Sequence, residues 1–406
     1  MKKLLILAGL SSLAWLIYAL FQPIIDWNFG WNQMPDSIQK QTFTGTEDPM
    51  YYDAIHASKL HLDSIVQISE SPSLSIAVMI QGKMAFTYVL GFQDLEKLIP
   101  ADTSTKYRVG SVSKALSSLG LAKMVEDETL NLDSSIQYYT ELFQDKPDIS
   151  IRQLASHQSG IRNYGACFCF PVWEYYRNAE FESVEASLGQ FEKDDLLFEP
   201  GASFSYSSYN YTALSYAMEK ASARNFLSYM GEYVFDPLQM ENTAADKSES
   251  TNKAIPYETN DGEYKEAFQV NLSNKWAGGG FISTPSDLVR AGNALLDSSF
   301  LDQSTIEELI TPQRLNDNTI NEQNYALGWR HDFSERYFGG KTKVEIIHHG
   351  GMAVGGMALL AVYPEYNLVF AITMNKSGQR GRFELFDYMR PIVDLFLRRE
   401  IQVELD

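Results

Sequence analysis

The chain has 406 residues, with 52 acidic and 33 basic side chains and a net charge of −19. Hydrophobic residues make up 45% and charged residues 21%, which indicates a globular protein and excludes a largely disordered chain. The negative charge would repel a phosphate backbone, so nucleic acid is not expected as a partner. The two cysteines, Cys167 and Cys169, are too few for a zinc or disulfide framework, so the redox compartment stays open.

The N-terminus carries the clearest localisation signal. Lys2 and Lys3 precede residues 4–21, a run of 18 residues without a charge. This length is at the lower end of what spans a bilayer, and no small-residue cleavage site follows closely. We expect residues 1–27 to be an uncleaved membrane anchor or, alternatively, a cleaved signal segment. Both alternatives place the remaining chain outside the cytoplasm. It would be anchored to a membrane or secreted, in the periplasm or outside the cell. The polar segment 28–48, with its glycine and proline residues, is expected to be a linker.

Apolar periodicity predicts the elements that follow. In the first part of the chain these are a helix over 50–68, a hairpin over 74–80 and 84–89, and a buried helix over 111–126. A mostly helical pattern continues to about residue 300, where Thr284 and Pro285 mark a helix start. The last part contains strands over 344–347, 357–362 and 368–374 and a helix over 382–398. We therefore expect one α+β domain over 49–400, with an antiparallel sheet built from both chain ends, flanking helices and an inserted helical lobe.

The segment around Ser111 carries a possible nucleophile and base. Ser111 and Lys114 are three residues apart, so they share one face of the predicted helix. Gly110 permits a tight turn, and the free N–H groups of the first helical turn favour a developing negative charge. A lysine whose pKa is lowered by burial can take the proton of a serine hydroxyl. The spacing alone is weak, because Ser250 and Lys253 share it.

Two further segments carry polar groups of interest. Tyr206 follows a turn and precedes a predicted helix, although any of the 23 tyrosines can be a core residue. His348 and His349 precede two glycines near a strand edge, and glycine lets a ligand approach the backbone. The pair could also be a metal site or ordinary polar turn residues. Adjacent histidines point to opposite faces of a strand, however, so no metal site is expected.

Together these segments resemble the serine β-lactamase and penicillin-binding-protein superfamily on its class C side. The motifs, in the order found there, are Ser111-Val112-Ser113-Lys114, Tyr206-Ser207-Ser208 and His349-Gly350-Gly351. The similarity extends from about residue 50 to 398 and includes the blocks 154–161, 195–201 and 276–281. These blocks are most similar to the branch of mitochondrial serine β-lactamase-like proteins and their bacterial relatives.

The resemblance implies roles for individual residues. It implies three catalytic residues, Ser111, Lys114 and Tyr206, and four substrate-binding residues, Ser208, His349, Gly351 and Met352. Ser111 would be the nucleophile, and Lys114 and Tyr206 would move its proton. The oxyanion would lie between the backbone N–H groups of Ser111 and Met352. This chemistry requires no metal or organic cofactor.

At two positions the sequence departs from the family pattern in a way that affects which substrate is expected. Ser208 stands where the family often has asparagine, and His349 replaces the lysine of the Lys-Thr-Gly element. A neutral histidine holds a substrate carboxylate less firmly than a permanent ammonium does. These changes make β-lactam turnover doubtful. His348 is the alternative register, and His349 is preferred because its distance to Pro364 matches the family strand.

The sequence thus favours a serine hydrolase that forms an acyl-enzyme with peptide or ester substrates outside the cytoplasm. The alternatives are a D-alanyl-D-alanine carboxypeptidase or β-lactamase, and a sensor or scaffold that accepts an acyl group without turnover. Expected partners are a small-molecule, peptide or cell-wall-type substrate and, through the N-terminal segment, a membrane. The aromatic stretch 164–181 is either core of the helical lobe or a wall of the cleft.

Overall fold

The computed structural model describes residues 2–35, 42–165, 174–340, 342–378 and 384–405, without the side chains of residues 2, 4–5, 19–28 and 401–405. Its centre is an antiparallel sheet with the strand order β11-β12-β13-β14-β3-β4-β2, and β5 pairs with β4. The strands are β2 (Thr42–Glu47), β3 (Ser73–Ile80), β4 (Lys83–Asp94), β5 (Ile99–Pro100), β11 (Arg330–Ser334), β12 (Val344–Ala353), β13 (Gly356–Tyr363) and β14 (Leu368–Met374).

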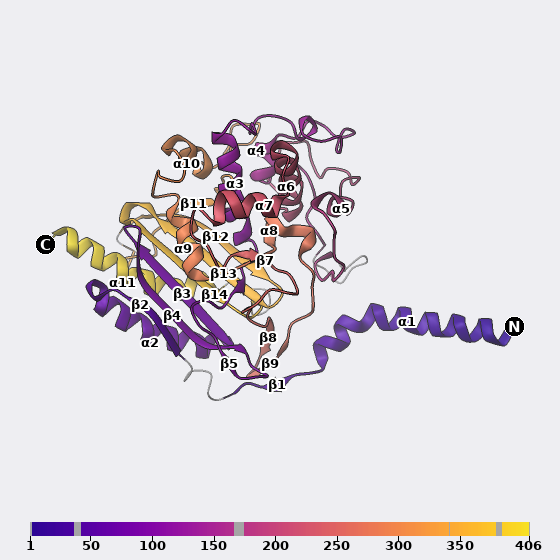
Figure 1. Ribbon diagram of the computed structural model, residues 1–406, viewed down its shortest axis with the longest axis horizontal. Coiled ribbons are helices and arrows are strands. Elements are labelled where there is room, and N and C mark those ends of the chain that lie inside the picture. The colour runs from indigo at the N-terminus through magenta and orange to yellow at the C-terminus, as the bar shows by residue number, and fades with distance from the viewer. Residues whose placement is uncertain (1, 36–41, 166–173, 341, 379–383, 406) are drawn as a thin grey trace.

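Both ends of the chain build this sheet, as the sequence predicts. β14 lies beside β3, with Met374 opposite Leu74 and Leu368 opposite Ile80. Figure 1 shows the early strands, in purple, beside the late strands, in orange, within one layer. The predicted α+β fold with an antiparallel sheet and flanking helices is confirmed.

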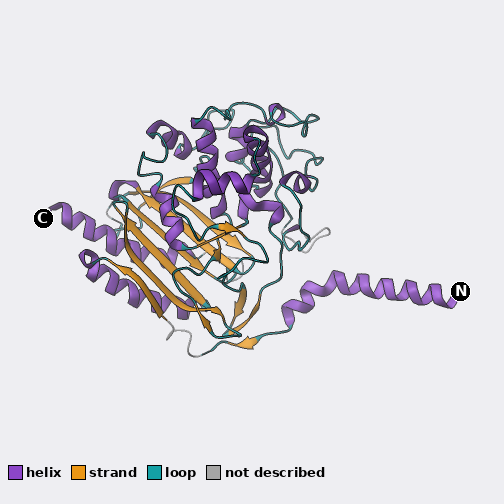
Figure 2. Ribbon diagram, in the orientation of Figure 1, coloured by secondary structure: helices purple, strands orange, loops and turns teal. Residues whose placement is uncertain are grey.

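Helices cover both faces of the sheet, which explains why its central strands β3, β13 and β14 are buried at every position. Along β13, Ala358 and Leu360 face the cluster that includes α3 (Val112–Glu126) and α9 (Pro285–Asn293). The alternate residues of β13 face α2 (Tyr52–Ser69) and α11 (Leu385–Leu405). Figure 2 shows these two helices on the side of the sheet away from the helical lobe.

The predicted buried helix is α3, and it connects the sheet to the helical lobe. Nearly all of its side chains are buried, because the lobe packs on one side and the sheet on the other. The lobe helices are α4 (Ile151–Ala155), α5 (Val184–Leu188), α6 (Ser208–Ser222), α7 (Phe226–Met230), α8 (Trp276–Gly279) and α10 (Gln303–Ile310), with single turns at Ile136–Tyr138, Gly231–Phe235 and Ser273–Lys275. Two further short turns are Pro49–Tyr51 and Pro364–Tyr366. α9 begins as predicted, with Thr284 Oγ1 accepting from the Asp287 N–H over 3.2 Å.

Two small sheets complete the body. One has the order β6-β10-β7 and the other β1-β9-β8. Their strands are β6 (Tyr107–Arg108), β7 (Ala244–Ala245) and β10 (Phe281–Ser283), and β1 (Asn32–Gln33), β8 (Tyr257–Asn260) and β9 (Glu263–Glu266). β6 leads directly into the loop before α3, so the first of these sheets fixes where that helix begins.

The N-terminal segment forms α1 (Lys2–Asn28), which extends away from the body in Figure 1. Within the described part of the chain, no helix is long and apolar enough to cross a membrane. The expected anchor at residues 1–27 therefore stays a prediction. Part of the segment 28–48, expected to be a linker, forms β1 and the edge strand β2, which pairs with β4. β2 is exposed along its whole length, which explains why its polar sequence resembles a linker.

Candidate active site

The start of α3 lies against β12, and two glycines make this approach possible. Gly110 has a φ of +50°, and a Cβ there would lie 2.7 Å from the backbone nitrogen of Met352. A Cβ at Gly351 would lie 1.9 Å from the Val109 carbonyl oxygen and 3.0 Å from the Ser111 nitrogen. Only glycine fits at both positions. The backbone segments that contain the Ser111 and Met352 nitrogens are therefore in close contact, and their role as oxyanion donors stays a prediction.

Lys114 contacts the expected nucleophile from inside the fold. Its side chain is fully buried, and its Nζ lies 3.2 Å from Ser111 Oγ. The same Nζ lies 3.0 Å from Ser208 Oγ and 2.5 Å from the Gly278 carbonyl oxygen. The helix therefore brings Ser111 and Lys114 together on one face, as their spacing predicts.

The surroundings of Lys114 favour the neutral amine. Burial lowers its pKa well below the ordinary value, and the charges of Arg330 and Lys275 lower it further. Among the described residues, none of the ion pairs includes Lys114. A neutral amine has two N–H donors and one lone pair. The donors match Ser208 and the Gly278 carbonyl, which leaves the lone pair for the hydroxyl proton of Ser111.

The second serine–lysine pair of this spacing has a different environment. Lys253 forms an ion pair with Asp246, which also accepts from Arg108 Nε over 2.6 Å. Ser250 Oγ donates to the Ala245 carbonyl over 3.4 Å. Lys253 therefore has a carboxylate partner, whereas the ion pairs of the described residues do not include Lys114. The structure thus distinguishes this pair from Ser111 and Lys114.

Tyr206 lies on the other side of Lys114, just before α6. The Lys114 Nζ is 4.8 Å from the ring centroid of Tyr206. The Ser111 side chain lies close enough to the Tyr206 hydroxyl to lower its pKa in part. Burial raises the pKa of Tyr206 above its ordinary value, so the phenol stays protonated. The buried His157 supports this loop: its ring centroid is 4.2 Å from that of Tyr206, and its Nδ1 accepts from the Ser207 N–H over 3.3 Å.

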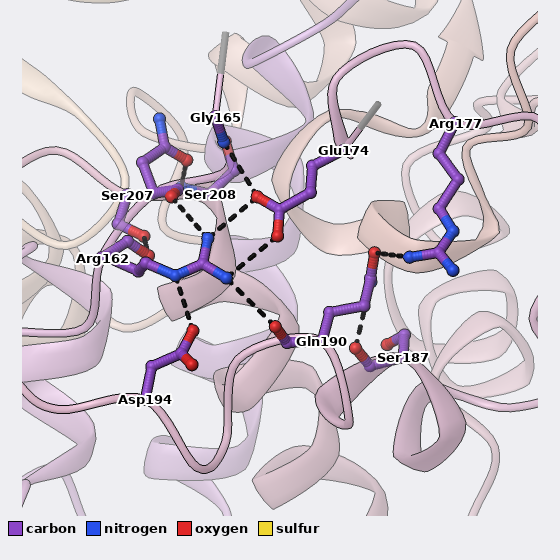
Figure 3. Close-up of polar contacts among 10 residues, drawn as sticks. Arg162, Gly165, Glu174, Arg177, Ser187, Gln190, Asp194, Ser207 and Ser208 are labelled. Atoms are coloured by element: carbon purple, nitrogen blue, oxygen red, sulfur yellow. Dashed lines mark hydrogen bonds and ion pairs between the residues drawn. The ribbon is translucent and has the colours of Figure 1, made fainter. Parts of the chain in front are cut away.

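A polar network holds Ser208 in place (Figure 3). The Ser208 N–H donates to Asn163 Oδ1 over 2.9 Å, and Ser207 Oγ donates to the Arg162 carbonyl over 2.7 Å. The Arg162 guanidinium donates to both oxygens of Glu174 over 2.9 Å. Ser208 is itself buried, so the structure places this expected substrate-binding residue in contact with Lys114.

His349 lies on the face of β12 that meets Tyr206, with 6.3 Å between the ring centroids. Its Nδ1 donates to the Gly350 carbonyl over 2.7 Å, so its Nε2 accepts from the Tyr325 hydroxyl over 3.0 Å. Burial, followed by the charges of Arg330 and Lys114, lowers the pKa of His349 well below its ordinary value. His349 is therefore neutral, as expected from the sequence.

His348 points to the opposite face of the strand. Its Nε2 lies 2.8 Å from Asp332 Oδ2, and its ring meets Phe386 edge-on. β12 continues through both histidines to Ala353, further than the strand predicted over 344–347. The geometry thus favours His349 over His348 as the residue beside the nucleophile.

Sequence reasoning missed several residues that contact this group. The Arg330 guanidinium lies 5.6 Å from the ring centroid of Tyr206 and 5.2 Å from that of Tyr325. No motif marks Arg330, Tyr325 or Asn163, because each comes from a loop or strand end whose position depends on the fold. Gly278 lies in the glycine-rich block 276–281, which is a signal that a sequence comparison can find.

The aromatic stretch is only partly described. Cys167 and Cys169 lie outside the described residues. Tyr164 is partly buried against the core of the lobe, and Tyr175 packs in a small cluster with Val354. Both side chains are half-buried, so the described part of the stretch packs on the core and also borders its surface.

Comparison with known proteins identifies the family. The family model described as beta-lactamase matches residues 62–393, the span that holds all three motifs above. The chain belongs to the beta-lactamase family. This family consists of serine hydrolases related to β-lactamases and penicillin-binding proteins.

Relatives and solved structures agree with this assignment. The human serine beta-lactamase-like protein LACTB, mitochondrial, is 28% identical over 81% of this chain and 75% of its own length. Penicillin-binding protein 4* of Bacillus subtilis is 23% identical over 73% of this chain and 66% of its own length. The D-amino acid amidase of Ochrobactrum anthropi SV3 has the same fold, with a TM-score of 0.70 and 22% identity over 87% of this chain and all of its own.

Proposed function

We propose that the protein is a serine hydrolase that forms an acyl-enzyme on Ser111 with peptide or ester substrates. One observation carries the proposal: the Lys114 Nζ lies 3.2 Å from Ser111 Oγ and has a pKa well below its ordinary value. A serine hydroxyl is a weak nucleophile until a base takes its proton. An amine that is neutral at working pH and within hydrogen-bond reach is such a base.

Acylation then proceeds in two proton steps. Ser111 Oγ attacks the substrate carbonyl while its proton passes to the Lys114 amine. The carbonyl π electrons move to the oxygen, which the Ser111 and Met352 N–H groups stabilise. When the tetrahedral intermediate collapses, the bond to the leaving group breaks and Tyr206 donates a proton to it. Lys114, protonated in the first step, returns a proton to the Tyr206 phenolate, which restores both groups.

Deacylation reverses these roles. Water attacks the acyl carbonyl, the Lys114–Tyr206 pair takes its proton, and Ser111 leaves as the restored hydroxyl. Proton transfer of this kind contributes about 10²–10⁴-fold to a rate. Each oxyanion donor contributes roughly 10²–10³-fold.

The residues around the nucleophile favour peptides or esters over β-lactams. Ser208, in the place where the family often has an amide, is held against Lys114. His349 is neutral and already accepts a hydrogen bond from Tyr325, so it offers no permanent positive charge to a β-lactam carboxylate.

We also propose that the catalytic body works outside the cytoplasm, attached to or exported across a membrane through residues 1–27. The support is the uncharged run 4–21 behind two lysines. Apolar side chains of α1 are exposed at several positions: Ile6, Leu7, Leu10, Leu13, Trp15 and Leu16. Intact-mass measurement of the mature protein from membrane and soluble fractions tests this. A cytoplasmic, freely soluble full-length chain would exclude the proposal.

The experiment that tests the catalytic proposal is covalent labelling of Ser111. We expect a fluorophosphonate to add one label to the wild type and none to Ser111→Ala. Ser250→Ala is the matched control, because Ser250 has the same spacing to a lysine. Labelling that survives in Ser111→Ala or disappears in Ser250→Ala would refute the assignment.

Turnover separates the alternatives. A panel of p-nitrophenyl esters and peptides, D-alanyl-D-alanine peptides and a chromogenic cephalosporin identifies the acyl donor. A sensor or scaffold without turnover predicts a stable adduct on Ser111 by intact-mass spectrometry and no release of acid. Multiple turnovers with an ester or ordinary peptide, and none with the cephalosporin, are the result that we expect.

A further inference from the structure

A second buried lysine, Lys275, lies near Lys114, and no ion pair among the described residues includes it. Lys275 ends the turn Ser273–Lys275 and directly precedes α8, whose Gly278 contacts Lys114. Only 6% of its surface is exposed. Its Nζ lies 4.5 Å from the ring centroid of Tyr164 and 5.1 Å from that of Tyr175. We call Lys275, Tyr164 and Tyr175 the tyrosine cage.

No acidic side chain compensates this ammonium within the described part of the chain, where the ion pairs do not include Lys275. Residues 166–173, which join the two tyrosines in sequence, contain neither aspartate nor glutamate. Other cations nearby are paired. The buried Arg108 pairs with Asp246. The half-buried Arg162 pairs with Glu174 (Figure 3). Aromatic faces compensate a buried charge only in part.

The tyrosine cage keeps its charge in spite of burial. Burial, followed by the charge of Arg108, lowers the pKa of Lys275 to about 8. The protonated form therefore still predominates at pH 7. Its charge reaches the catalytic group, because it also lowers the pKa of Lys114. A desolvated cation without a partner is a site that gains strongly from an anionic ligand.

The tyrosine cage is connected to the catalytic residues on one defined side. Tyr164 lies near Ser208, the residue that contacts Lys114, because the Ser208 side chain lowers the pKa of Tyr164 in part against the effect of burial. Tyr175 packs with Val354, two residues beyond Met352. His349 is three residues before Met352, so the cage and His349 lie on opposite sides of the proposed oxyanion position along the chain.

This arrangement indicates which half of the substrate meets the tyrosine cage. Tyr206, which gives the leaving group its proton in the proposed mechanism, contacts His349 and Tyr325. The leaving group therefore departs on the His349 side, and the acyl half extends toward Val354 and the cage.

We propose that Lys275 binds a carboxylate on the acyl half of the substrate. The preferred acyl donors are thus esters or peptides whose acyl group carries a negative charge a few bonds from the scissile carbonyl. This inference rests on the proposed function, and it assigns the carboxylate to a lysine outside the three family motifs.

The test compares two esters of similar size, mono-4-nitrophenyl adipate, which is anionic, and 4-nitrophenyl methyl adipate, which is neutral. We expect the wild type to have the higher kcat/KM with the anionic ester. Lys275→Met should reduce the ratio of the two kcat/KM values about 10-fold, the effect of one charge-assisted hydrogen bond. Loss of the Lys275 charge also raises the pKa of Lys114, but the resulting fall is common to both esters and cancels in this ratio. Lys275→Arg should retain the preference.

Control variants distinguish carboxylate binding by Lys275 from a purely structural role of this lysine. Lys220→Met, at an exposed lysine over Tyr216, should change neither ester. An equal fall for both esters in Lys275→Met, or a preference lost in Lys275→Arg, would overturn the inference.

If neither ester is hydrolysed and Ser111 is not labelled, the proposed function has failed. Whether Lys275 binds a carboxylate is then tested separately, by ligand binding to Ser111→Ala. Adipate should then raise the melting temperature of Ser111→Ala more than adipamide does, and Lys275→Met should abolish the difference. Equal shifts with the two compounds would refute a carboxylate site.

Discussion

The hydroxyl of Tyr325 lies 3.0 Å from Nε2 of His349, and this bond ties the loop before β11 to the strand beside the nucleophile. Both side chains are buried, so neither group has water as an alternative partner. The contact keeps the His349 proton on Nδ1 and the ring on the Tyr206 face of β12.

We predict that Tyr325→Phe leaves Nε2 of His349 unpaired and lowers the free energy of unfolding by about 1–3 kcal/mol. Activity should fall as well, because His349 is then free to rotate beside the substrate. The control is Tyr337→Phe, which removes a buried 2.6 Å contact with Tyr363 on the far face of the sheet. Urea unfolding and ester kinetics check both variants; similar kcat/KM losses in the two would contradict the prediction.

The pH dependence of acylation should follow Lys114. Because its pKa is lowered, the amine becomes neutral well below the ordinary lysine range, and kcat/KM should rise with pH through that lowered value and then level off. Lys114→Arg stays protonated at every accessible pH, so we expect a loss of about 10³-fold. Stopped-flow acylation between pH 5 and 10 measures this, and a profile that persists in Lys114→Arg would exclude Lys114 as the base.

The lowered pKa of Lys114 should also make the free energy of unfolding depend on pH. Between the lowered folded pKa and the ordinary value of roughly 10.4, the unfolded chain binds more protons at Lys114 than the folded chain. The free energy of unfolding should therefore rise with pH across this window. Lys114→Met should be free of this contribution, so wild type and variant should converge as the pH rises from 7. A difference independent of pH would mean that Lys114 is not buried as a neutral amine.

Ser208→Ala tests the second contact of the lysine. It removes one of the two groups that orient the Lys114 amine, and we expect kcat/KM to fall about 10-fold while phosphonate labelling of Ser111 persists. Ser215→Ala is the matched control, because its Oγ bonds only to the Thr212 carbonyl within α6. An unchanged rate in Ser208→Ala would show that the Gly278 carbonyl alone positions the amine.

Gly351→Ala tests the contact between α3 and β12. Its Cβ would meet the Val109 carbonyl at 1.9 Å, so the strand must shift away from the helix. We expect about 1–3 kcal/mol of destabilisation and a loss of roughly 10²-fold in kcat as the oxyanion donors separate. Gly231→Ala, where a Cβ meets nothing within 4 Å, should stay close to wild type. Wild-type kcat in Gly351→Ala would argue against Met352 as a donor.

Local patterns predicted the parts of the molecule that depend on near neighbours. The hairpin of β3 and β4, the buried helix α3 and the capped start of α9 each follow from periodicity or turn chemistry within a short window. The sequence predicts a linker over 28–48 and not β2, because an exposed edge strand has no apolar alternation to detect. β12 proved longer than predicted, since its glycines and histidines lack strand propensity and tertiary pairing with β13 holds them extended.

In the candidate site, too, local spacing predicts some residues, whereas others depend on the tertiary fold. The spacing of Ser111 and Lys114 and the resemblance led to the residues that the structure brings together. The contacts of Arg330, Asn163 and Lys275 were not predictable, because each depends on where a distant loop or turn meets the catalytic group. A buried lysine without an acidic partner has no sequence pattern at all.

The pairing of β14 with β3 has a consequence for synthesis of the protein. Leu74 and Met374 are opposite each other in the sheet. β3 is therefore synthesised long before β14, and it can pair with β14 only when nearly the whole chain has been translated. Until then the nascent chain exposes one long edge of β3 and the sheet-facing side of α3. Chaperone binding or a translational pause would act within this interval, and truncation before residue 368 should leave a chain that aggregates rather than one with partial activity.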